Sequence, residues 1–94
     1  MKNLDEVFDI YQSFLDFVSR DYKYNVDFYE KVKVDETTGK ESALLNFNNG
    51  FKVELSNQQN VENTAALRCW WYDEENAVEI STLDQLVEKF LNHD

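Results

Sequence analysis

The apolar residues of the chain change their spacing once, and this change constrains the fold more than any other feature. Between residues 4 and 22 they recur every three or four positions, which is the pattern of one buried stripe on an α-helix. After residue 24 they alternate with polar residues, which is the pattern of a strand with one buried side. The chain is therefore expected to begin with a helix and to continue as a sheet.

The helical pattern predicts an amphipathic helix over residues 4–21, with Asn3 as its N-cap and Glu6 placed to complete a capping box. Its apolar stripe comprises Leu4, Val7, Phe8, Tyr11, Phe14, Leu15, Val18 and Tyr22. A second, shorter helix closes the chain, capped by Ser81 or Thr82. Its apolar face comprises Leu83, Leu86, Val87, Phe90 and Leu91.

Five strands are predicted between the two helices. The first covers residues 24–34, and its inward side comprises Tyr24, Val26, Phe28, Val32 and Val34. The next two flank Asn49-Gly50, a residue pair typical of tight hairpins. A fourth strand over residues 65–72 and a short fifth over residues 77–80 are separated by the acidic turn 73–76.

Short links favour antiparallel neighbours. The sequence therefore predicts a single α+β domain over residues 1–94, in the order α-β-β-β-β-β-α. We expect a two-layer sandwich in which both helices cover one face of a five-stranded antiparallel sheet.

Two adjacent tryptophans in the fourth strand bear on the surface offered to partners, because successive strand side chains face opposite sides. The set without a polar member comprises Ala65, Leu67, Cys69 and Trp71, which places Trp71 in the core. Trp70 and Tyr72 are then expected on the face without helices, together with Tyr29, as a candidate contact surface. The alternative is that these aromatic residues only stiffen the sheet. A register shift of one residue would exchange the two tryptophans.

The net charge is −10, from 19 acidic and nine basic residues, with −4 in residues 1–55 and −6 in residues 56–94. Such a chain is repelled by nucleic acid and by anionic lipid and is attracted to basic protein surfaces. The acidic candidates for a partner contact are Asp73, Glu74, Glu75 and Glu79 and, on the first helix, Asp5, Asp9 and Asp16. The last three are spaced by about 6 and 10 Å along the helix axis, which is similar to phosphate spacings on nucleic acid. The alternative is an ordinary solvated helix face.

Catalytic and metal-binding patterns are weak. His93 is the single histidine and stands next to the last residue, and Cys69 has an inward position that favours an inert thiol. The acidic turn has neither the further oxygens nor the central glycine of a calcium loop. We therefore expect a protein that is not an enzyme and needs no cofactor or metal. The N-terminal residues form no apolar leader and no run is long enough to span a membrane, so we expect a cytoplasmic protein.

In size, charge, acidic turn (Asp73, Glu74 and Glu75) and helix–meander–helix plan, the chain resembles the small acidic anti-defence proteins of phages and mobile elements. These include anti-CRISPR proteins that act as DNA or RNA mimics. The resemblance implies a protein inhibitor that binds a basic, nucleic-acid-handling protein, as a monomer or a homodimer.

Two other functions remain open. The first is an immunity protein or antitoxin that neutralises a basic nuclease toxin. The second is a nucleic-acid binder that uses the outer sheet face as a stacking platform, although the net charge disfavours direct nucleic-acid contact. That platform would comprise Lys31, Lys33, Lys52 and Arg68 with Tyr29, Trp70 and Tyr72.

Overall fold

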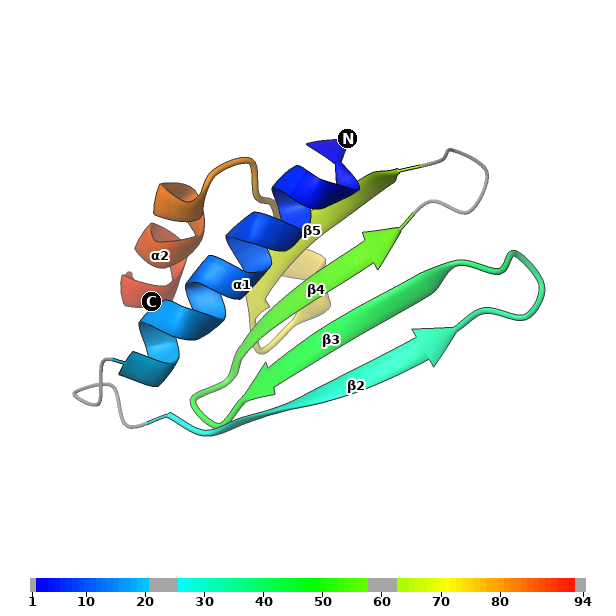
Figure 1. The fold of residues 1–94 in the computed structure, drawn as a ribbon. Helices are drawn as coiled ribbons and strands as arrows, with labels where there is room; N and C mark the ends of the chain where they lie inside the picture. Colours follow the sequence, from blue (N-terminus) through cyan, green and yellow to red (C-terminus); the bar gives the residue numbers. More distant parts are fainter. Residues whose placement is uncertain (1, 21–25, 58–62, 93–94) are drawn as a thin grey trace.

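The computed structural model describes residues 2–20, 26–57 and 63–92. It has two layers, in which helices α1 (Leu4–Arg20) and α2 (Leu83–Leu91) lie on one face of an antiparallel sheet (Figure 1). The predicted α+β class, with both helices on the same face, is confirmed. None of the helices in these ranges is long and apolar enough to cross a membrane.

Four long strands form a meander in the order β5-β4-β3-β2. Their bounds are Phe28–Val34 for β2, Glu41–Phe47 for β3, Phe51–Asn57 for β4 and Thr64–Trp71 for β5. Two short strands, β1 (Lys2–Asn3) and β6 (Val78–Glu79), pair with β5. The five predicted strands are therefore present, and β1 is an addition, because two residues are too short to show alternation.

Both helices begin at the predicted caps. The Asn3 side chain accepts a hydrogen bond of 2.8 Å from the backbone N–H of Asp5. The Thr82 hydroxyl accepts one of 3.1 Å from the N–H of Gln85, whose own side chain accepts from the N–H of Ser81 at 2.9 Å. Each cap satisfies a backbone donor that the first helical turn leaves free.

The core between the layers is centred on Phe14 of α1. Its ring centroid lies 5.4 Å from that of Phe90, 5.8 Å from that of Phe47 and 6.0 Å from that of Phe51. Such edge-on and tilted aromatic pairs add to the stabilisation from burial alone. A small domain therefore obtains a dense core from four phenylalanines contributed by α1, β3, β4 and α2.

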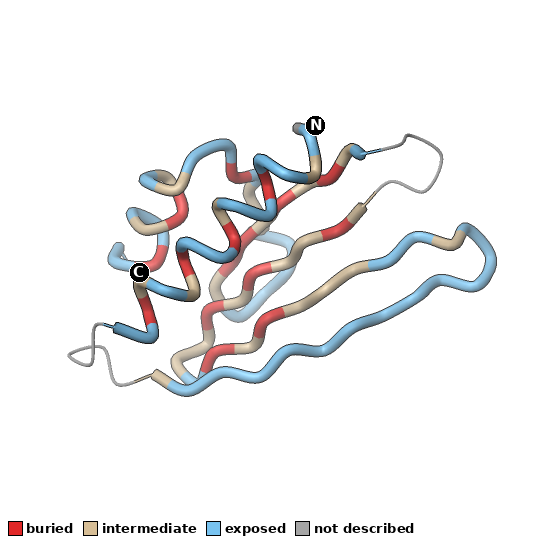
Figure 2. The backbone as a smooth tube through the Cα atoms, in the orientation of Figure 1, coloured by how far each residue is buried: buried red, intermediate tan, exposed pale blue. Residues whose placement is uncertain are grey.

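The helices cover β4 and β5 and leave β2 uncovered (Figures 1 and 2). All seven residues of β2 are exposed. Val32 and Val34 point to the helix side as predicted, but they remain 61% and 57% exposed. The expectation of a half-buried first strand is therefore wrong, because α1 lies on the same face but over β4 and β5, away from the edge formed by β2.

Some predicted features lie outside the described residues. They are Tyr22, Tyr24 and His93, together with the last residue of the predicted first helix and the start of the first strand.

Candidate protein-binding surfaces

Trp71 faces the helices, as the alternation in the fourth strand predicted. Its ring centroid lies 4.8 Å from that of Phe51, and its indole N–H donates to the backbone carbonyl of Lys89 in α2 at 2.9 Å. Trp71 is partly buried. It joins the end of β5 to the second helix, so the predicted register of this strand is correct.

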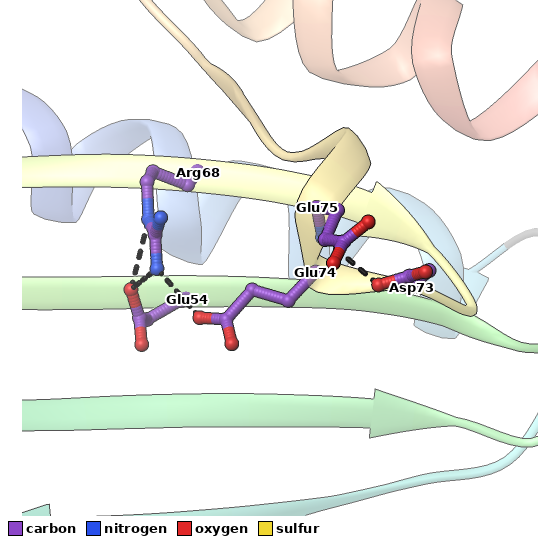
Figure 3. Close-up of polar contacts among 5 residues, drawn as sticks. All are labelled: Glu54, Arg68, Asp73, Glu74 and Glu75. Atoms are coloured by element: carbon purple, nitrogen blue, oxygen red, sulfur yellow. Dashed lines mark hydrogen bonds and ion pairs between the residues drawn. The ribbon is translucent and has the colours of Figure 1, made fainter.

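Trp70 lies on the opposite face of the sheet, yet it is only 6% exposed. The chain after β5 turns back over this face, and the 3-10 helix η1 (Glu74–Asn76) contacts β5 there (Figure 3). The Arg68 guanidinium lies 5.5 Å from the centroid of the Trp70 ring. The expectation that Trp70 offers an exposed contact surface is therefore wrong, because the acidic turn and Arg68 cover it.

Tyr72 does not continue the alternation. The strand ends at Trp71, and Tyr72 adopts a φ of 61°, which redirects its side chain. Its hydroxyl donates to the carbonyl of Asn49 at 3.1 Å, and its N–H donates to the carbonyl of Gly50 at 2.9 Å. The side chain remains 65% exposed. The prediction that it lies beside Trp70 is wrong, because it lies against the β3–β4 hairpin.

Tyr29 lies on the outer face as predicted and is 65% exposed. The row across the sheet runs from Tyr29 through Asn46 and Lys52 to Trp70. Three strand spacings of about 4.8 Å therefore separate the two aromatic residues. Tyr29 and Trp70 do not form one aromatic patch.

The acidic turn is engaged with its own chain (Figure 3). Arg68 donates to the Glu54 carboxylate from Nε at 3.0 Å and from Nη2 at 2.6 Å, and from Nη2 to Glu74 at 2.9 Å. These bonds, those to Glu54 first, raise the pKa of Arg68 above its usual value. The Asp73 carboxylate caps η1 by accepting from the N–H of Glu75 at 3.0 Å. Much of the charge of the acidic turn is therefore used in contacts that hold residues 73–76, the segment covering Trp70, in place.

The carboxylates of α1 are placed differently. Asp5, Asp9 and Asp16 are exposed on the side of the helix opposite its buried residues. Within the described ranges, no cation lies within ion-pairing distance of these three.

Charge is segregated between the two layers. The helices α1 and α2 carry six carboxylates and two cations, a net −4. The carboxylates are those of Asp5, Glu6, Asp9, Asp16, Asp84 and Glu88. Strands β2–β5 carry three carboxylates and four cations, and all four cations lie on the outer face: Lys31, Lys33, Lys52 and Arg68.

The predicted acidic residues therefore form two groups. Those of α1 lie in the helix layer, whereas Asp73, Glu74, Glu75 and Glu79 follow β5 and belong to the segment that covers the outer face. One flat partner surface cannot contact both groups. Asp84 and Glu88 of α2 are two further exposed carboxylates of the helix layer. They were not among the predicted contact residues, although their spacing of four on the polar side of a predicted helix was visible in the sequence.

Two of the expectations from the sequence concern a reactive thiol and a metal site. Cys69 is buried, and burial raises the pKa of its thiol from 9.0 to about 11, with Lys89 opposing the shift. Within the described ranges no group of three or more metal-ligating side chains occurs. A hollow of about 390 Å³ opens between η1 and the end of α2, with Trp71, Tyr72 and Lys89 among its walls.

Comparison with known proteins yields no match to a protein-family model, a curated protein or a solved structure.

Proposed function

We propose that this protein binds and inhibits a basic, nucleic-acid-handling protein through the acidic side of its helix layer. The observation that carries the proposal is the row of Asp5, Asp9 and Asp16 on α1, which is exposed and has no described cation within ion-pairing distance. Carboxylates that no described cation pairs with retain their capacity for charge-assisted hydrogen bonds to lysine and arginine.

The helix presents these charges on a rigid support. Seventeen residues of α1 span about 26 Å, and the aspartates are separated by about 6 and 10 Å along the axis. A groove that binds a nucleic-acid backbone holds its basic side chains at similar intervals. Little conformational entropy is lost when such a helix binds, because the core already holds it in place.

The same electrostatics serves two kinds of inhibitor. One is an anti-CRISPR-like protein that occupies the nucleic-acid groove of a defence nuclease, and the other is an immunity protein or antitoxin that covers a nuclease toxin. The nucleic-acid-binding platform has less support. Trp70 is buried, and Arg68 is paired with Glu54 and Glu74, so two members of that platform are occupied.

The experiment is affinity purification with mass spectrometry from the native host, using two baits. One bait is the wild-type protein, and the other carries Asp5→Asn, Asp9→Asn and Asp16→Asn. We expect a nucleic-acid-handling protein on the wild-type bait, its loss from the variant, and its release by added duplex DNA or RNA. The identity of the captured protein separates a defence nuclease from a toxin. Equal capture on both baits, or no release by nucleic acid, would contradict the proposal.

A further inference from the structure

β2 is the last strand of the sheet, and no described strand pairs with its free edge. Its seven residues are all exposed. Natural proteins usually shorten, cover or bend such an edge, or place lysines along it, because its unpaired N–H and C=O groups can join a foreign strand. An uncovered edge of seven residues is therefore a surface that can accept another strand.

The hydrogen bonds at both ends of β2 show which backbone groups point outward. The N–H of Asp35 donates to the carbonyl of Lys40 at 2.9 Å, and the N–H of Asn48 donates to the carbonyl of Asp27 at 2.8 Å. Bonded and non-bonded pairs alternate along an antiparallel ladder. The outward-pointing N–H and C=O groups are therefore those of Phe28, Glu30, Val32 and Val34.

The two sides of this edge differ in chemistry. Val32 and Val34 lie on the helix side and leave more than half of their surface exposed. Lys31 and Lys33 lie on the outer side. At the start of the strand, beside Tyr29, lies a hollow of about 180 Å³ whose walls include Phe28 and Phe47. The helix side also carries Glu30, whose carboxylate accepts a hydrogen bond from the Tyr11 hydroxyl of α1. Beyond Glu30, the edge combines free backbone groups, two exposed valines on the helix side and two lysines on the outer side.

We propose that β2 pairs with an extended segment of a partner protein in which apolar and acidic residues alternate. The apolar residues of that segment would cover Val32 and Val34, and its carboxylates would lie opposite Lys31 and Lys33 across the new strand pair. Apolar and opposite-charge cross-strand pairs of this kind each stabilise a sheet. This inference does not depend on the acidic side of α1, which belongs to a different layer.

Pairing with a second copy is disfavoured by charge. The antiparallel register that pairs the whole of β2 with another β2 sets Lys31 opposite Lys31, and the register centred on Val32 sets Lys31 opposite Lys33. Like charges directly opposite each other destabilise a strand pair. The lysines therefore select against self-association while they favour an acidic strand.

The first measurement is amide hydrogen exchange by NMR, with and without a short capped peptide that alternates valine and glutamate. The peptide is expected to slow exchange at Glu30, Val32 and Val34, whose amides point outward, and to leave Tyr29, Lys31 and Lys33 unchanged. A peptide that alternates valine and lysine is the control and should have no effect. Protection that is absent, or that does not follow this alternation, would overturn the proposal.

Two variants test the backbone contact. Val32→Pro removes one outward N–H, and proline is tolerated on edge strands where that N–H faces solvent. Val32→Ala shortens the side chain by a similar amount but retains the N–H. We expect the proline variant to lose the peptide and the alanine variant to keep detectable binding, at unchanged protection of Lys31 in both free proteins. Peptide binding by the proline variant equal to that of the alanine variant would contradict strand addition.

The charge contact is tested by reversing the charge of both lysines. Lys31→Glu combined with Lys33→Glu should weaken binding of the valine–glutamate peptide by about tenfold and should create binding to the valine–lysine peptide, which the wild type lacks. Unchanged peptide preference would overturn the charge assignment. Sedimentation of the wild-type protein alone is expected to show no dimer that Val32→Pro disrupts, and such a dimer would identify a second copy as the occupant instead.

Discussion

The aromatic ring of Tyr72 lies directly over Gly50, so that a Cβ on Gly50 would overlap it. Both residues have positive φ, 98° at Gly50 and 61° at Tyr72. The contact joins the β3–β4 hairpin to the point where the chain leaves β5. It therefore fixes where the covering segment after β5 begins.

Replacement of this glycine is expected to destabilise the fold. Gly50→Ala should lower the free energy of unfolding by about 1–3 kcal/mol, because alanine is strained at this φ and its methyl group displaces the Tyr72 ring. Urea unfolding measures the change. Gly39→Ala is the matched control, because Gly39 also has a positive φ, of 73°, but lies between β2 and β3, away from Tyr72. An equal loss in both variants would show that the Tyr72 contact contributes nothing.

Trp70 should behave as a core residue although it lies on the face without helices. Trp70→Ala is expected to lower the free energy of unfolding by about 3–5 kcal/mol, the usual range for a buried tryptophan. Tyr29→Ala, on the same face but exposed, should change it by no more than about 0.5 kcal/mol. Chemical denaturation of the two variants measures their free energies of unfolding. Similar, small effects in both would mean that η1 does not cover Trp70 in solution.

The alternation of residues within each strand was sufficient to predict the fold class and to place Trp71 towards the helices. It could not predict the burial of Trp70. That burial depends on the positive φ of Tyr72 and on the ion pairs of Arg68 with Glu54 and Glu74. These contacts join three separate segments of the chain, and no local pattern reports them.

The exposure of β2 could not be predicted from the spacing of its apolar residues either. Val32 and Val34 alternate with polar residues as a half-buried strand would. Periodicity shows which side of a strand is apolar, but it does not show which strands a helix covers. Here α1 contacts β4 and β5, and the edge strand is left exposed. The acidic row on α1 was predictable, because helix geometry alone sets its spacing.

Cys69 should make stability depend on alkaline pH. The folded protein keeps the thiol neutral up to a pKa of about 11, whereas its ordinary value is 9.0. Unfolding releases a proton over this interval, so the free energy of unfolding should fall as the pH rises from 9 to 11. Below pH 9 this contribution is fully present.

The measurement is urea unfolding across that interval for the wild type and for Cys69→Ala. Between pH 9 and pH 11, the free energy of unfolding should fall less for the variant than for the wild type. Tyr11, whose pKa is raised by burial and by the hydrogen bond to Glu30, titrates in both proteins and cancels in the comparison. Parallel curves for the two proteins would contradict the assigned shift of the thiol.

The most direct test of the central claim compares two variants of equal net charge. One carries Asp5→Asn, Asp9→Asn and Asp16→Asn, and the other carries Asp73→Asn, Glu75→Gln and Glu79→Gln, so that each has a net charge of −7 instead of −10. Calorimetric titration of the captured partner at low salt gives the affinity of each. We predict that the α1 variant binds at least about tenfold more weakly than the wild type, while the second variant stays within about twofold. Equal loss in both variants would contradict the account, because net charge and not the acidic side of α1 would then determine binding.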